Sequence, residues 1–166
     1  MEDYGSLVER ALSGPYFEDL KPGLRYRNPL GRTVTDVDNI WFTLLTSNVN
    51  PIHFDKGYTE KNYPGEPFKG RLVVNGLLTL SIAIGLTTHL SSRGFMLGIE
   101  NVKFHKPVFS GDTIYAEAEV IEARESKSRP GFGIVRLRIR AYNQNNDLLL
   151  ECDRTIMVPK RDHRWA

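Results

Sequence analysis

The run VVNGLLTLSIAIGL, residues 73–86, is the feature that most constrains the fold of this chain. As a helix it is apolar on nearly all sides, so the rest of the domain must cover it from most directions. It is too short to span a bilayer, and Thr79, Ser81 and Gly85 interrupt it. The run therefore predicts one central, buried helix around which the other elements are arranged.

The chain after this helix has the pattern of strands. Residues 114–120 and 135–141 place apolar side chains at every second position, which is typical of a strand with one buried face. Asn145, Asn146 and Asp147 predict a turn before a last strand over residues 148–158. One buried helix followed by successive long strands indicates an α+β domain, in which a long antiparallel sheet wraps around the helix.

A second helix is predicted ahead of the central one. Thr35 and Asp38 have the spacing of a capping box, and apolar residues then recur as one helix face. These apolar residues are Val37, Ile40, Trp41, Leu44 and Leu45. Pro51 has no amide hydrogen and restricts Asn50 to extended conformations, so the helix must end before it. Residues 46–53, TSNVNPIH, should form a turn-rich loop.

Length and composition indicate one globular domain. The 166 residues are 40% apolar and 25% charged, which fits a single domain over residues 1–166. We expect a short helix at residues 6–12 and treat residues 1–25 as an N-terminal extension whose role the sequence does not reveal.

Several classes of protein are disfavoured by the same data. A net charge of +2 lacks the concentrated basic face of a nucleic-acid binder, and the acidic start MEDYGSLVERAL is not a signal peptide. The single cysteine, Cys152, cannot form an internal disulfide, which favours a reducing cytoplasm. Because Cys152 lies in an alternating run, we expect a packed or a solvent-side thiol rather than a catalytic one. We expect no contact with nucleic acid or membrane.

No cofactor motif is evident. The histidines, carboxylates and the cysteine do not have metal-ligand spacing, and no phosphate-binding glycine loop or Gly-x-Ser-x-Gly turn is present. We therefore expect neither a metal nor a redox cofactor.

His53 is the best candidate for proton transfer, because imidazole titrates near cellular pH. A histidine beside a loop is more often structural. The surroundings favour function here, since a rigid Asn50-Pro51 turn and a second amide, Asn48, lie beside it and a buried helix begins about twenty residues later.

The segments NPIHFD, VNGLLTL and KFHKPVFSGDTI together resemble the MaoC-like family of (R)-specific enoyl-CoA hydratases, over roughly residues 30–158. The resemblance implies a hot-dog fold and a homodimer or higher homo-oligomer with an active site near the subunit interface. It also implies an acyl-CoA substrate, whose coenzyme A is part of the substrate rather than a separate cofactor.

The family loop reads Gly-Asp-x-Asn-Pro-hydrophobic-His, and its Asp and His add water to the double bond of an enoyl thioester. By resemblance the histidine is His53, the asparagine is Asn50, the aspartate position holds Asn48, and the glycine position holds Ser47. The amide of Gly76, at the start of the central helix, would form the oxyanion hole. A helix N-terminus suits this task because its N–H groups lack acceptors and carry partial positive charge.

Asn48 departs from the family, which has an aspartate at this position. The change matters because an amide has no useful basicity and can only orient water. Two readings follow. Either His53 carries the proton while Asn48 and Asn50 hold the water, or the chemistry is lost and acyl-CoA binding remains. Asp55 is a less favoured replacement carboxylate, because a residue two positions past His53 on an extended segment need not enter the same pocket.

The stretches DNIWFTLLTSN and RAYNQNNDLLLECDRTIMVP are similar to a subgroup associated with mesaconyl- or itaconyl-CoA hydration, which often carries Asn at this position. This resemblance predicts a cation for a second carboxylate, with Arg71 and Arg93 as candidates. Lys127 and Arg129 are candidates for the phosphates of coenzyme A. For all four, a solvated surface charge is the alternative.

The sequence thus favours a hydro-lyase that reversibly hydrates a 2-enoyl-CoA, and the subgroup resemblance implies a branched C5-dicarboxyl-CoA. A thioester hydrolase on the same fold is one alternative. A non-catalytic acyl-CoA-binding protein with a decayed site is the other.

Overall fold

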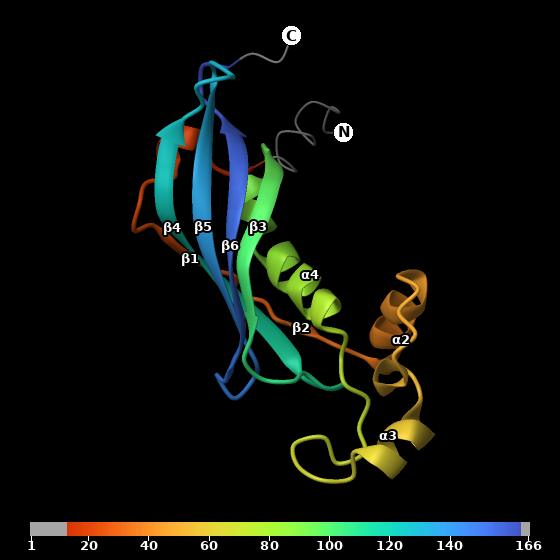
Figure 1. Ribbon diagram of the computed structural model, residues 1–166. Helices are drawn as coiled ribbons and strands as arrows, with labels where there is room; N and C mark the ends of the chain where they lie inside the picture. Colours follow the sequence, from red (N-terminus) through yellow and green to blue (C-terminus); the bar gives the residue numbers. More distant parts are fainter. Residues whose placement is uncertain (1–12, 164–166) are drawn as a thin grey trace, which may run out of the picture.

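A computed structural model describes residues 13–163 and contains one antiparallel sheet that curves beside a central helix (Figure 1). The strands are β1 (Arg25–Arg27), β2 (Arg32–Thr33), β3 (Phe95–Phe104), β4 (Thr113–Glu125), β5 (Phe132–Tyr142) and β6 (Leu148–Pro159). Their order is β1-β4-β5-β6-β3, with β2 also paired to β4. The predicted α+β architecture and its three long strands are confirmed, whereas β3 was not predicted. The expected helix at residues 6–12 lies outside the described residues.

The helices precede β3 in the chain. They are α2 (Asp36–Leu45), α3 (Lys56–Asn62) and α4 (Gly76–Leu86), with short 3-10 turns η1 (Phe17–Asp19), η2 (Pro51–His53) and η3 (Thr88–Ser91). None of the helices within residues 13–163 is long and apolar enough to cross a membrane.

The core lies between α4 and the inner face of the sheet. In β4 as far as Val120, and along β5, every second side chain points inward and is almost fully buried. These are Ile114, Ala116, Ala118 and Val120 on β4, and Val135, Leu137, Ile139 and Ala141 on β5. Helix α4 packs against the same two strands, where Ala83 is also fully buried and allows close approach. The period-two pattern of the sequence thus corresponds to the face that covers the helix.

Helix α4 is less enclosed than the sequence predicted. It begins at Gly76 rather than Val73, because Val73 is extended and forms a bridge with Phe109. Only Thr79 and Ala83 within the helix are fully buried, and Leu77 is 58% exposed. The expectation of a helix buried on most sides is therefore wrong for a single chain, because the sheet covers one side and leaves apolar surface on the other.

Helix α2 has the predicted bounds but an unexpected orientation. The capping box is present, with Thr35 accepting from the amide of Asp38 at 3.3 Å and Asp38 accepting from the amide of Thr35 at 2.8 Å. The residues that are buried are polar, Asn39 and Thr43, whereas Trp41 on the apolar face is 68% exposed. The hydrophobic face of this helix therefore points away from its own chain.

Cys152 is buried on the inner face of β6, and burial raises the pKa of its thiol to about 11. Since the thiolate is the reactive species, the native protein should react with a disulfide reagent such as dithiobisnitrobenzoate far more slowly than the unfolded protein. Release of the coloured thiol before and after addition of urea measures the difference. Cys152→Ala supplies the background, and rapid reaction of the native protein would contradict a packed, unreactive thiol.

Candidate active site

A cavity of about 310 Å³ brings His53 together with Gly76. It lies where η2, the first turn of α4 and the segment that follows β3 meet. Its lining is His53, Val73, Val74, Gly76, Thr79, Phe104, His105, Lys106, Pro107 and Val108. Two of the four residues that the sequence proposed for catalysis therefore share one cavity, although they are 23 positions apart in the sequence.

His53 is half-buried at the end of η2, and a backbone carbonyl orients its ring. Nδ1 lies 2.8 Å from the carbonyl oxygen of Val73. Because a carbonyl oxygen can only accept, Nδ1 must carry the hydrogen. In the neutral imidazole the free lone pair is then on Nε2. Nε2 can therefore accept a proton on the side of the ring that faces away from the Val73 carbonyl.

Asn39, a residue that the sequence pattern did not single out, lies directly behind this arrangement. Its side chain is fully buried and donates from Nδ2 to the carbonyl oxygens of His53, at 2.8 Å, and Val73, at 3.0 Å. Its Oδ1 accepts from the backbone amide of Asn75 at 2.8 Å. The only sequence signal was a polar residue within a predicted helix, which by itself is ordinary.

Gly76 is the first residue of α4, with Asn75 as the N-cap. The first N–H groups of a helix have no intrahelical acceptor and carry partial positive charge, so they suit an anionic oxygen. A Cβ added at Gly76 would lie 3.2 Å from the ring of Phe104, which also lines the cavity. A side chain here would therefore press on Phe104 and narrow the space beside the amide.

Asn48 and Asn50 shape the turn that carries His53. The side-chain oxygen of Asn48 accepts from the amide of Asn50 at 2.9 Å, and that of Asn50 accepts from the amide of Ile52 at 3.3 Å. Neither residue is among those that line the cavity. Ser47 has φ of 55°, a left-handed conformation that glycine adopts most easily, which fits the glycine that the sequence resemblance places at this position.

Asp55 has a local structural role. Its carboxylate accepts from the amide of Tyr58 at 2.9 Å and caps α3. It does not line the cavity, so nothing in the geometry favours it as a replacement base.

Arg71 lies close in sequence to the cavity wall but points elsewhere. Its guanidinium is 3.7 Å from the centroid of the Phe109 ring and donates to the carbonyl oxygens of Phe68 and Pro67, at 3.2 and 2.9 Å. It is not one of the residues that line the cavity.

The other proposed binding residues lie at the far end of the molecule within one chain. Arg93, beyond the C-terminal end of α4, donates to the carbonyl oxygen of Gly14 at 2.7 Å. Lys127 and Arg129 are exposed in the loop between β4 and β5, which Figure 1 shows at the opposite end from α3. A single chain therefore does not bring these three cations to His53.

Two basic residues that the sequence did not nominate, Lys106 and His105, do line the cavity. Lys106 forms an ion pair with Asp147 at 2.5 Å, and Nε2 of His105 lies 3.5 Å from Glu151. Both follow β3 directly, and since β3 was not predicted, no pattern indicated that its end would meet the start of α4.

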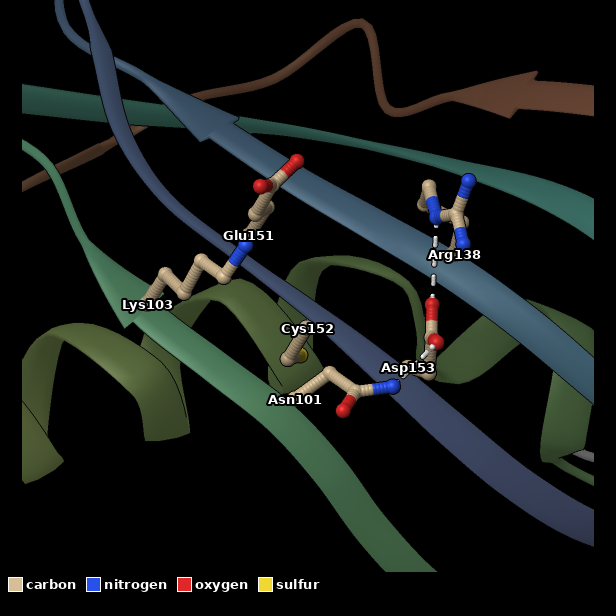
Figure 2. A pocket seen from close by; sticks show the side chains of 6 residues that line it. All are labelled: Asn101, Lys103, Arg138, Glu151, Cys152 and Asp153. Carbon is tan, nitrogen blue, oxygen red and sulfur yellow. Dashed lines mark hydrogen bonds and ion pairs between the residues drawn. The ribbon is translucent and has the colours of Figure 1, made fainter.

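A second cavity, of about 300 Å³, lies on the outer face of the sheet (Figure 2). Asp153 is only 5% exposed there and accepts hydrogen bonds from Asn101, Arg136 and Arg138 at 2.9, 2.8 and 3.1 Å. Burial alone would raise its pKa, but these bonds and the arginine charges hold the pKa below its ordinary value. Because this carboxylate is already neutralised, the cavity has the character of a structural network. Within residues 13–163, no His, Cys and carboxylate side chains cluster as a metal site.

Asp153→Asn should lower the free energy of unfolding by about 2 kcal/mol at neutral pH, because two arginines lose a buried countercharge. Since the folded-state pKa is depressed, this contribution is present above the unfolded pKa of about 3.9 and is lost as the pH falls through the folded value. Urea unfolding of both proteins at several pH values measures it. Glu100→Gln is the matched control. The Glu100 carboxylate is exposed and lies 3.6 Å from Arg136, farther away than Asp153 at 2.8 Å. An equal loss in the control would contradict a special role for Asp153.

Known proteins resemble this chain in sequence and in structure. A family model described as "MaoC like domain" matches residues 19–141. A mesaconyl-CoA hydratase from Haloarcula marismortui is 27% identical over 97% of this chain and 45% of its own length. An (R)-specific enoyl-CoA hydratase from Rhodospirillum rubrum is 29% identical over 88% of this chain and 93% of its own length.

A solved protein of Mycobacterium tuberculosis, described as having a double hotdog fold, superposes with a TM-score of 0.80 at 25% identity. The superposition covers 93% of this chain and 47% of that protein. The chain thus spans about half the length of the mesaconyl-CoA hydratases it matches and of this double-fold structure.

Proposed function

The chain belongs to the MaoC-like domain family, and from this premise we propose that it is a hydro-lyase that reversibly adds water to the double bond of a 2-enoyl-CoA thioester. The observation that carries the proposal is the cavity shared by His53 and the N-terminal end of α4 at Gly76. Relatives named (R)-specific enoyl-CoA hydratase and 3-hydroxybutyryl-CoA dehydratase support the reaction type.

In the proposed mechanism, the thioester carbonyl oxygen accepts from the N–H of Gly76, and a water molecule lies between Nε2 of His53 and C3 of the enoyl group. His53 takes a proton from the water as its oxygen attacks C3. The electron pair of the double bond moves toward the thioester, and the helix terminus stabilises the resulting enolate oxygen. His53 then returns the proton to C2, which completes the addition of one water molecule.

Asn48 and Asn50 enter this mechanism only as donors. Their side-chain oxygens are engaged in the turn, whereas neither NH2 group donates to another group within residues 13–163. A side-chain NH2 group can hold a water by its oxygen but cannot remove a proton from it, and neither residue lines the cavity of a single chain. His53 therefore acts alone as acid and base. No metal or redox cofactor takes part in the proposed chemistry.

The more specific substrate we propose is a branched C5-dicarboxyl-CoA of the mesaconyl kind, because several relatives carry that name. The second carboxylate then needs a cation close to the reacting carbons. Lys106 suits this role better than Arg71 or Arg93, since it lines the cavity, and His105 beside it can donate a hydrogen bond to the carboxylate.

We also propose that the protein acts as a homodimer. Strand β3 is an edge of the sheet with exposed apolar residues, and Figure 1 shows β3, α4 and α2 on the same side of the molecule. The exposed residues on these elements include Phe95, Met96, Leu97, Leu77, Trp41 and Leu44. A second copy would cover this surface, much as a double-fold protein supplies two units in one chain.

Such a dimer also gives a role to the distant cations. If two β3 strands pair as antiparallel neighbours about a two-fold axis, the end of one β3 lies beside the start of the other. The partner copy then brings its Arg93, and the loop with Lys127 and Arg129, to the end of the molecule that holds His53. The phosphates of coenzyme A would meet these cations across the interface.

The reaction is tested by incubating the protein with crotonyl-, mesaconyl- and itaconyl-CoA while ultraviolet absorbance and free thiol are both recorded. We expect absorbance of the enoyl thioester to fall without thiol release. Release of thiol would instead indicate a thioesterase, and tight binding without either signal would indicate a non-catalytic binding protein.

His53→Gln should lower kcat by about 100-fold or more, because it removes the only group in the proposed mechanism that transfers protons. His89→Gln, a histidine outside the cavity, is the matched control and should stay near the wild-type rate. Unchanged hydration by the His53 variant would overturn its role.

Asn48→Asp should raise kcat on crotonyl-CoA by about tenfold, because it restores the carboxylate that the resemblance to the enoyl-CoA hydratases places at this position of the loop. Either oxygen of the carboxylate can still accept from the amide of Asn50, so the loop geometry should persist. Asn50→Asp carries the same change of charge two residues away and tests whether position matters. A fall in kcat for Asn48→Asp would show that the amide is adapted to a particular substrate.

Leu97→Lys should convert the dimer to a monomer in light scattering, because it places a charge on the exposed edge strand. Leu30→Lys introduces the same change at an exposed leucine between β1 and β2 and should leave the dimer intact. A monomeric wild-type protein would contradict the proposed assembly.

A further inference from the structure

The buried side chain of Asn39 connects the two halves of the candidate active site. One half is the turn Pro51–His53, which carries the imidazole, and the other is the segment that leads into α4 at Gly76. Asn39 is the fourth residue of α2 and belongs to neither half. No other side chain within residues 13–163 bonds to the backbone of both, since His53 itself reaches Val73 only through its ring.

Each bond of Asn39 holds a different part of the site. Nδ2 holds the carbonyl oxygen of His53 and therefore the backbone from which the imidazole projects, at 2.8 Å. It also holds the carbonyl oxygen of Val73, at 3.0 Å, which is the oxygen that orients Nδ1 of the ring. Oδ1 holds the amide of Asn75, the residue immediately before Gly76, at 2.8 Å.

The side-chain amide of Asn39 suits this position, and few other side chains could take its place. A side-chain amide offers two N–H donors and one carbonyl acceptor. Here the two donors meet the carbonyl oxygens of His53 and Val73, and the acceptor meets the backbone amide of Asn75. A carboxylate would lack the donors, and a hydroxyl would be too short to span three backbone groups. Because Asn39 is completely buried, water does not replace its bonds at low cost.

We infer that Asn39 is a positioning residue that sets the separation and orientation of His53 relative to the N–H of Gly76. Its role rests on the proposed hydration, in which the base must reach water at C3 while the amide of Gly76 holds the thioester oxygen. Reactions of this kind are sensitive to geometry, and a misplacement of about 1 Å can cost about 100-fold in rate. Asn39 does not touch the substrate in this scheme and acts only through His53, Val73 and Asn75.

The test compares Asn39→Ala with Thr59→Val, a change of similar structural severity elsewhere. Thr59 is also fully buried, and its hydroxyl donates to the carbonyl oxygens of Gly70 and Lys56, at 2.8 and 2.9 Å. Both variants should lose stability in urea unfolding, because each removes the hydrogen bonds that a fully buried side chain makes to backbone carbonyl groups. Assays are run where both proteins remain folded.

For Asn39→Ala, we expect kcat for crotonyl-CoA hydration to fall by about 100-fold with little change in KM, whereas Thr59→Val should retain most of its kcat. If the two variants lose kcat equally for an equal loss of stability, Asn39 has only a structural role and the inference is overturned. If Asn39→Ala does not fold, Asn39→Asp takes its place in the test. The aspartate keeps the size of the side chain and its acceptor but, when ionised, lacks both donors.

A second readout does not depend on activity. In the wild type, nitrogen NMR of labelled histidine should show His53 with hydrogen on Nδ1, and the His53→Gln spectrum identifies the signal. In the Asn39 variants the ring should populate both tautomers, because the Val73 carbonyl loses the Asn39 donor that fixes its direction and is held only through the backbone bond from the Val73 amide to Ile52, while Thr59→Val should match the wild type. An unchanged tautomer in the Asn39 variants would overturn the inference. If the wild type fails to hydrate any enoyl-CoA, the proposed function fails while this measurement still decides the role of Asn39.

Discussion

Helix α4 has no polar face, and much of the structure follows from the need to cover it. The sheet supplies one cover, with β4 and β5 presenting small and branched residues that allow the helix to approach. A single sheet cannot enclose a helix, so the opposite side of α4 and the edge strand β3 remain apolar and exposed. The same arrangement leaves the first turn of α4 at the margin of the core, where its N–H groups can meet a ligand.

The site is assembled around that first turn by polar contacts between short segments. The turn at Asn50 and Pro51 projects His53, the carbonyl of Val73 orients its ring, and Asn39 ties both to the start of the helix. These contacts are hydrogen bonds between particular groups, whereas the apolar packing around them does not depend on any one pair of residues. This division explains how α2 can bury its polar residues and leave Trp41 exposed: within one chain the helix supports the site rather than the core.

The elements that could be predicted from the sequence are those that depend on neighbouring residues or on a regular spacing of apolar residues. Alternation identified β4, β5 and β6, the capping box located the start of α2, and proline ended that helix before the loop. His53 and Gly76 were proposed together by family resemblance, and they line one cavity. Strand β3 escaped prediction because its side chains are largely exposed on both faces of an edge, so it lacks the alternation that marks half-buried strands.

By itself, the sequence determined the α+β class, the central helix and the turn that carries His53, because each depends on residues close together in the chain. Only the tertiary structure decided which distant groups meet. It brought Lys106 and His105 to the cavity, sent Arg93, Lys127 and Arg129 to the other end, and set Asn39 behind His53. Such encounters depend on how elements are oriented in space, and a hydrogen bond between residues 34 positions apart leaves no periodic trace in the sequence.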